Sequence, residues 1–133
     1  MQSSLKALAV AACVSALTAT FLAGPAAAAE STLVLSIKDQ DALLLPESRT
    51  LGCDRHPWVT TGSHPRRKQA CDALHRARGN FGNLGSTGAF CPMIYQPVTV
   101  SATGRYRGMK INFKAVHSNA CVAAADTADI FRF

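Results

Sequence analysis

Residues 98–115, with the sequence VTVSATGRYRGMKINFKA, carry the most regular pattern in this chain. Apolar and polar residues alternate over residues 98–103 and again over residues 109–115, and a turn around Gly104 separates the two runs. Such alternation is typical of antiparallel strands with one buried and one solvated face. The stretch therefore predicts a β-hairpin with an apolar inner face and a basic outer face.

Further strand patterns lie on both sides of this hairpin. Residues 33–37 alternate in the same way, residues 48–53 predict a second short strand, and residues 130–133 predict a closing strand. Residues 54–65 contain two prolines, a glycine and two histidines, which predicts a loop.

Two helices complete the expected fold. Ser63 is expected to cap a helix that begins near Pro65 and ends at Gly79. Residues 119–128 are rich in alanine and predict a short second helix, whereas residues 80–88 are rich in glycine and asparagine and predict a flexible surface loop. Apolar residues recur along the first helix every three or four positions, at Ala70, Cys71, Leu74 and Ala77. Helices on one face of an antiparallel sheet make the predicted class α+β.

The first 29 residues have the composition of an export signal. Lys6 precedes an uncharged apolar run over residues 7–23, and a Gly-Pro pair and four alanines follow, ending at Ala29. This order is typical of a secretory signal peptide that is cleaved after Ala29. The alternative is a transmembrane anchor, which the short, alanine-rich run and the cleavage-type sequence disfavour. We therefore expect a signal peptide over residues 1–29 and one secreted, extracellular domain over residues 30–133.

Removal of the signal leaves 104 residues, a net charge of +5 and four of the five cysteines. An even number of cysteines in an exported chain indicates two disulfides, although spacing alone leaves three pairings open. A metal site is disfavoured because no CxxC or HxxxH spacing occurs. The remaining cysteines are Cys53, Cys71, Cys91 and Cys121.

Two classes of function can be weighed against the residues present. A hydrolase is disfavoured, since the small chain lacks a GxSxG motif and three of its four histidines fall where a solvated imidazole is expected. A secreted binding module for an anionic partner is the second class, because residues 66–68 with Arg76 and Arg78 form one basic cluster and Lys110 with Lys114 another. No aromatic residues interleave with these charges and no nucleic-acid motif is present, so solvated faces explain them better.

Residues 89–97, AFCPMIYQP, place large apolar side chains between a glycine-rich stretch and a strand, where polar turn residues are expected. Pro92 fixes one backbone torsion and Pro97 restricts the residue before it. From residue chemistry alone, this segment is either a buried strand or a rigid, exposed recognition loop.

The order of several motifs resembles the Streptomyces subtilisin inhibitor family. These motifs are CPMIYQPV at 91–98, GMK at 108–110, SNAC at 118–121 and the final FRF, with GSHP at 62–65 and ACDAL at 70–74 upstream. The resemblance covers nearly all of the chain after the signal.

The resemblance implies a fold, a partner and a site. The fold is a five-stranded antiparallel sheet with two helices packed on one face, in a homodimer formed through the sheet. The protein is then an inhibitor of subtilisin-like serine proteases and not an enzyme. No cofactor, metal or nucleic acid is expected, and no membrane association after signal cleavage. A metalloprotease is an additional target to consider.

The implied site lies in the apolar segment. Its reactive bond is Met93–Ile94, with Phe90, Cys91, Pro92 and Tyr95 in the protease-binding loop and Asn119 supporting the loop from behind. The implied disulfides pair Cys53 with Cys71 and Cys91 with Cys121.

Overall fold

A computed structural model describes residues 31–41, 43–54 and 59–133. The predicted signal peptide lies outside these residues. The sheet is built from β1 (Thr32–Asp39), β2 (Glu47–Asp54), β3 (Val59–Thr61), β4 (Val98–Tyr106) and β5 (Met109–His117). The other elements are α1 (Arg67–Arg76), the short 3-10 helix η1 (Phe81–Asn83) and α2 (Ala120–Asp126).

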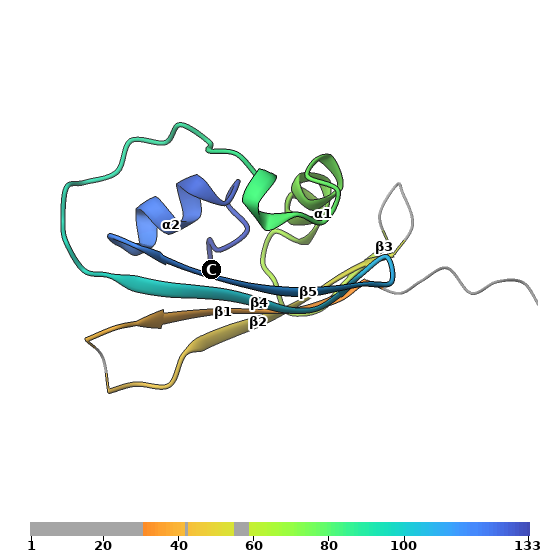
Figure 1. Ribbon diagram of the computed structural model, residues 1–133, viewed down its shortest axis with the longest axis horizontal. Coiled ribbons are helices and arrows are strands. Elements are labelled where there is room, and N and C mark those ends of the chain that lie inside the picture. The colour runs from red at the N-terminus through yellow and green to blue at the C-terminus, as the bar shows by residue number, and fades with distance from the viewer. Residues whose placement is uncertain (1–30, 42, 55–58) are drawn as a thin grey trace, which may run out of the picture.

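The five strands form one antiparallel sheet in the order β3-β2-β1-β4-β5. Both helices cover the same face of this sheet, and the opposite face is open (Figure 1). The predicted α+β class, with five antiparallel strands and two helices on one face, is therefore confirmed.

The core forms where the apolar faces of the predicted elements meet. The alternation in β1 and β4 buries every second side chain, and the helical spacing in α1 buries one stripe of that helix. Three phenylalanines pack together beside β5, with the Phe81 and Phe113 ring centroids 5.0 Å apart and those of Phe113 and Phe131 6.4 Å apart. The buried core includes Leu33, Leu35, Leu51, Cys71, Leu74, Val98, Val100, Ala102, Ala123, Ile130 and Phe131.

Two sequence predictions about strands are wrong. Residues 54–65 contain β3, which pairs with β2 through three residues on each strand. Residues 130–133 form no strand. Ile130 and Phe131 are apolar because they are buried against the core, and the Ile130 carbonyl accepts a hydrogen bond from a side chain instead of a neighbouring strand.

The start of α1 also differs from its prediction. Ser63 does not cap this helix, because its Oγ accepts a hydrogen bond from the Thr50 backbone N–H at 3.0 Å. The backbone N–H of Arg66 instead donates to Nδ1 of His64 at 3.0 Å.

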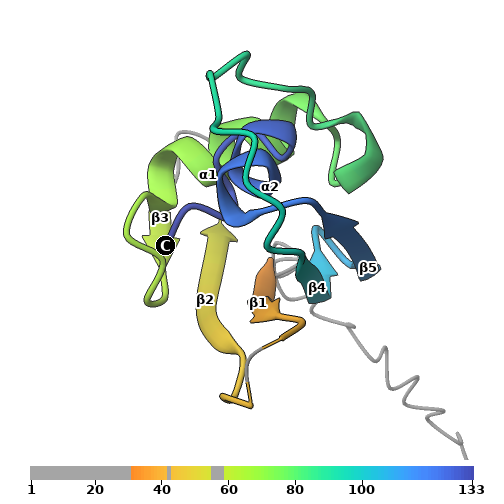
Figure 2. The same ribbon diagram turned by 90° about the vertical axis from the view of Figure 1, so that its left-hand side faces the viewer.

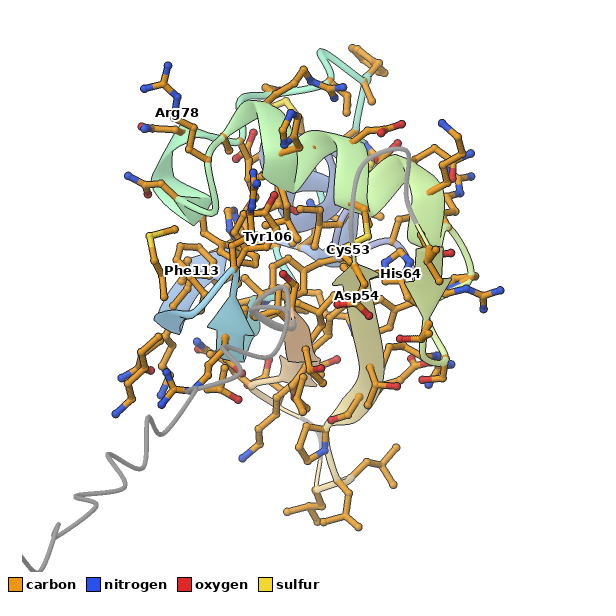
Figure 3. All side chains as sticks on the ribbon, turned by 90° about the vertical axis from the view of Figure 1, so that its right-hand side faces the viewer. Cys53, Asp54, His64, Arg78, Tyr106 and Phe113 are labelled. Atoms are coloured by element: carbon orange, nitrogen blue, oxygen red, sulfur yellow. A yellow bond between two sulfur atoms is a disulfide. The ribbon has the colours of Figure 1, made fainter. Side chains whose placement is uncertain are left out.

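His64 is not a solvated side chain but a fully buried one. Its Nε2 lies 2.7 Å from the Ile130 carbonyl, and with Nδ1 accepting from Arg66, the proton belongs on Nε2. Figure 3 shows His64, with Tyr106 and Phe113, between the helical layer and the sheet. Burial lowers the pKa of the His64 imidazole, and nearby arginines lower it further, against the opposing effect of the Ile130 carbonyl.

The segment at residues 80–88 is more ordered than a flexible loop. Asn80 caps η1 by accepting a hydrogen bond from the Gly82 N–H at 2.9 Å, and Phe81 is buried in the aromatic cluster. Glycine and asparagine dominate this segment, so its composition predicted a flexible loop. Phe81 nevertheless belongs to the buried core.

Candidate functional site

Residues 84–97 connect η1 to β4 without a helix or strand, and in Figure 1 they arch over α2. Their largest apolar side chains point into solvent: Phe90 is 98% exposed, Met93 103%, Tyr95 82% and Ile94 59%. Of the two readings of this segment, the structure selects the exposed loop. Such exposure is rare for side chains of this size without a binding partner. We call residues 90–95 the binding loop.

The segment that contains the binding loop is tied to α2 and to the connection between β5 and α2 at several points. A disulfide joins Cys91 to Cys121 in α2, with 5.7 Å between their Cα atoms. Further along, the Gln96 N–H donates to the Ser118 carbonyl at 2.9 Å, and ahead of the loop the Thr87 N–H donates to the Ala125 carbonyl at 2.8 Å. The second disulfide joins Cys53 in β2 to Cys71 in α1. These pairs are the ones that the resemblance implies.

Asn119 reaches the binding loop from the residue before α2. Its Nδ2 donates to the Ile94 carbonyl at 2.8 Å and to the Pro92 carbonyl at 3.3 Å, so its two hydrogen bonds flank Met93 on both sides. Its Oδ1 accepts from the Val122 N–H at 2.9 Å and thereby caps α2. Asn119 is only 8% exposed, and its amide links the helix to the loop.

These two roles explain why asparagine stands at this position. An N-cap needs a short side chain with an acceptor, and the loop needs two donors on the same group. Asparagine supplies both, because its amide carries one acceptor oxygen and two N–H groups.

An open groove of about 280 Å³ lies between the binding loop and the start of α2, and it is lined by residues 91–95 together with Ser118, Asn119 and Val122. The loop is therefore not packed tightly onto the helix. Its shape depends on the disulfide, the proline residues and the few hydrogen bonds described above, so single changes at these points should alter it.

Sequence patterns did not single out Gln96. Its backbone N–H anchors the end of the binding loop, and its side-chain Nε2 donates to Asp39 Oδ2 at 2.7 Å. The available signal was its position before Pro97, which favours extended backbone.

The basic cluster on α1 is partly paired. Arg66 lies 3.5 Å from Asp129, Lys68 lies 3.2 Å from Asp72, and Arg67 donates to the Gly62 carbonyl at 3.1 Å. Within the described residues no group of three His, Cys, Asp or Glu side chains could hold a metal ion. Across the same residues, no helix has both the length and the hydrophobicity needed to cross a membrane.

Comparison with known proteins places this geometry in a family. A family model described as subtilisin inhibitor-like matches residues 29–119. Protease inhibitor SIL-V2 of Streptomyces orinoci is 37% identical over 109 residues, which cover 79% of this chain and 97% of that protein. A transglutaminase-activating metalloprotease inhibitor of Streptomyces mobaraensis is 30% identical over 110 residues, covering 79% of this chain and 72% of that protein.

A solved structure shows the same fold. Streptomyces caespitosus sermetstatin, crystallised in complex with Bacillus licheniformis subtilisin, matches with a TM-score of 0.58 and 28% identity, over 76% of this chain and 97% of the sermetstatin chain. These relatives are inhibitors and not enzymes. On the match to the family model and on these relatives, the chain belongs to the subtilisin inhibitor-like family.

Proposed function

We propose that this protein inhibits subtilisin-like serine proteases by presenting the binding loop to their active site as a substrate would, with Met93–Ile94 as the reactive bond. The observation that carries this proposal is the pair of hydrogen bonds from Asn119 to the carbonyls of Pro92 and Ile94, which hold a fully exposed Met93 between them. Membership of the family supports the class of target.

Recognition follows from the exposure of the binding loop, which belongs to no helix or strand of the fold. A serine protease pairs with an extended segment through backbone hydrogen bonds, while alternate side chains enter pockets. Met93 is the P1 side chain and fills the S1 pocket, and Phe90 lies three residues ahead, at P4. Both side chains are free of contacts that binding would have to break, as their exposures of 103% and 98% show.

Inhibition instead of digestion follows from the anchoring of the loop. Because the loop is already held in one shape, little conformational entropy is lost on binding, and affinity rises. When the catalytic serine Oγ attacks the Met93 carbonyl carbon, the C–N bond to Ile94 breaks, an ester forms and the amine of Ile94 takes up a proton. The Cys91–Cys121 bridge holds one side of the cut, and Asn119 holds both carbonyls that flank it. The amine therefore stays close to the ester and re-forms the peptide bond.

The protein is proposed to act outside the cell, after removal of residues 1–29. The two disulfides support this location, since such bonds form and persist in oxidising surroundings. Mass spectrometry of the exported protein should find Glu30 at the N-terminus.

A homodimer through the open face of the sheet is proposed as well. That face carries no helix, and it exposes Val34 at 44% and Val116 at 59%. Sedimentation velocity should give twice the mass of the chain, and a lysine at Val34 should shift the population toward the monomer.

Titration of purified subtilisin with the mature protein tests the function. Activity should fall linearly and reach zero at one binding loop per enzyme, because protease–inhibitor complexes of this kind bind at nanomolar Kd or tighter, about −12 kcal/mol. Turnover of the protein as an ordinary substrate, with activity retained, would refute the proposal.

A metalloprotease is a second candidate target, since the Streptomyces mobaraensis relative is named as an inhibitor of one. The same titration with a secreted metalloprotease decides this point. Loss of activity in the presence of saturating, inactivated subtilisin would show a separate site.

A further inference from the structure

A second apolar surface lies at the same end of the molecule as the binding loop. The turn between β1 and β2 exposes three consecutive leucines: Leu43 is 105% exposed, Leu44 78% and Leu45 93%. Among the described residues, the large exposed apolar side chains number eleven, and seven of them belong to this turn and the binding loop. Leucines scattered singly on a surface are normal, but three in a row indicate contact with a partner. We call residues 43–45 the leucine turn.

Strand register explains why the leucine turn lies beside the binding loop. β1 pairs with β4 up to Asp39 opposite Val98, so β1 ends where the binding-loop segment enters the sheet. The Gln40 N–H then donates to the Pro97 carbonyl at 3.0 Å, and the Gln40 side chain donates to Thr99 Oγ1 at 3.2 Å. In Figure 2, which views this end directly, the turn extends below β1 and β2 while the loop descends to β4.

A side-chain hydrogen bond joins the residue that follows the binding loop to the end of β1, which leads into the leucine turn. A groove also lies between the two segments. The side-chain Nε2 of Gln96, which lies two residues before the start of β4, donates to Asp39 Oδ2 at 2.7 Å. The groove between the two segments has a volume of about 340 Å³, and its lining includes Leu44 and Leu45 of the turn, Gln96 and Ala120, and the carboxylates Asp39 and Glu47. The turn is therefore coupled to the binding loop by hydrogen bonds at its base.

We infer that the leucine turn is a second contact surface for the same protease, on the side that follows the reactive bond. The inference rests on the proposed function, which makes Gln96 the third residue after that bond. A protease seated on Met93 covers the residues that follow it, and the groove continues from Gln96 to the leucines. The partner surface that fits is an apolar patch on the rim of the protease cleft, beyond the pockets for the primed residues.

The position of the turn favours the protease over a second copy of this chain. The proposed dimer uses the open face of the sheet, where Val34 and Val116 are exposed. The groove instead lies at the end of the sheet and is lined in part by Gln96 and Ala120, which flank the loop and its support. A partner in the groove therefore also touches the binding-loop segment.

The test replaces all three leucines with serine, a change that leaves the core intact because the side chains are exposed. The Kd for subtilisin should rise about 10- to 100-fold, mainly through faster dissociation, as expected for losing part of the burial of two or three leucines. Met109→Ser is the matched control, since Met109 is a half-exposed apolar residue at the start of β5, paired with Tyr106 at the end of the hairpin opposite to Val98, where the binding-loop segment enters the sheet. Its Kd should equal that of the unchanged protein.

Three further readouts keep the outcomes apart. The triple variant combined with Met93→Ala should show the two losses multiplied, because separate surfaces contribute additively to the binding free energy. An unchanged Kd in the triple variant, when the unchanged protein inhibits subtilisin, would overturn the inference and leave the proposed function standing. A changed sedimentation coefficient with an unchanged Kd would assign the turn to a second copy, and faster cleavage at Met93 would make it a support of the loop. Either result overturns the inference.

Discussion

Replacing Asn119 with serine separates the two roles of this side chain. Asparagine caps α2 through Oδ1 and holds the binding loop through Nδ2. Serine is an equally good N-cap, so it can keep the bond to the Val122 N–H. Its hydroxyl is too short to reach the carbonyls of both Pro92 and Ile94. The variant should therefore keep a capped helix beneath an unsupported loop.

The magnitude follows from the bonds that are lost. The two hydrogen bonds to the loop are worth about 1–3 kcal/mol together, since a typical intramolecular hydrogen bond contributes about 0.5–1.5 kcal/mol net. The two carbonyls belong to an exposed segment, where water can replace the amide. We therefore expect the serine variant to be cleaved at Met93–Ile94 about 10- to 100-fold faster, because each kcal/mol of lost restraint favours release of the new amine over religation.

Asn119→Ala is the comparison, because it loses the cap as well as the loop support. Its unfolding free energy should be lower than that of the serine variant by about 1 kcal/mol, the usual value of an N-cap. Cleavage should nevertheless be equally fast in both variants. The assay incubates each with a catalytic amount of subtilisin and follows the return of activity and the cleaved chain by mass spectrometry, while urea unfolding gives the stabilities.

Two results would refute this reasoning. A serine variant that resists cleavage like the unchanged protein would show that the loop keeps its shape without Asn119. Cleavage rates that follow the unfolding free energies of the two variants would show that proteolysis proceeds through global unfolding and not through the loop.

Three other predictions follow from the same structure. Met93→Lys should move inhibition from subtilisin toward trypsin, because the S1 pocket recognises this side chain. Titration of both enzymes measures the change, and no gain against trypsin would show that the reactive bond lies elsewhere. Replacing Cys91 and Cys121 with serine should lower the unfolding free energy by about 3–4 kcal/mol and turn the inhibitor into a substrate. Removing the Cys53–Cys71 disulfide should also destabilise the fold, but at temperatures where the protein stays folded it should not speed cleavage of the loop. The unfolding free energy should fall as the pH drops below 6.5, since the pKa of buried His64 is lowered from that value and the unfolded chain takes up the proton more readily. This contribution to the pH dependence of stability should be missing in His64→Gln. Identical urea midpoints in the two proteins across this pH range would contradict the prediction.

Local pattern was sufficient where each element is regular and long enough. The alternation over residues 98–103 and 109–115 predicted β4 and β5, and the spacing of Ala70, Cys71 and Leu74 predicted the buried stripe of α1. The three residues of β3 are too few to show a period of two, so this strand was missed. The apolar residues at the C-terminus read as a strand because burial against a core produces the same composition.

The candidate site, too, could be predicted from the sequence only in part. Exposure could not be read from the chemistry of residues 90–95, because large apolar side chains suit a buried strand as well as a binding surface. Only the arrangement of the loop above α2 decides between them. Asn119 shows the same limit, since its position before an alanine-rich run is typical of a helix cap, but the carbonyls it binds lie 25 and 27 residues earlier.

The sequence by itself determined the strands of the hairpin, the first helix, the number of cysteines and an unusually apolar segment beside Cys91, because each of these depends on neighbouring residues or on composition. The tertiary structure alone decided that this segment faces solvent, that the leucine turn shares its end of the sheet, and that His64 is buried beneath the C-terminal segment. These features depend on contacts between residues far apart in the chain, and such contacts are set by how the helices pack on the sheet.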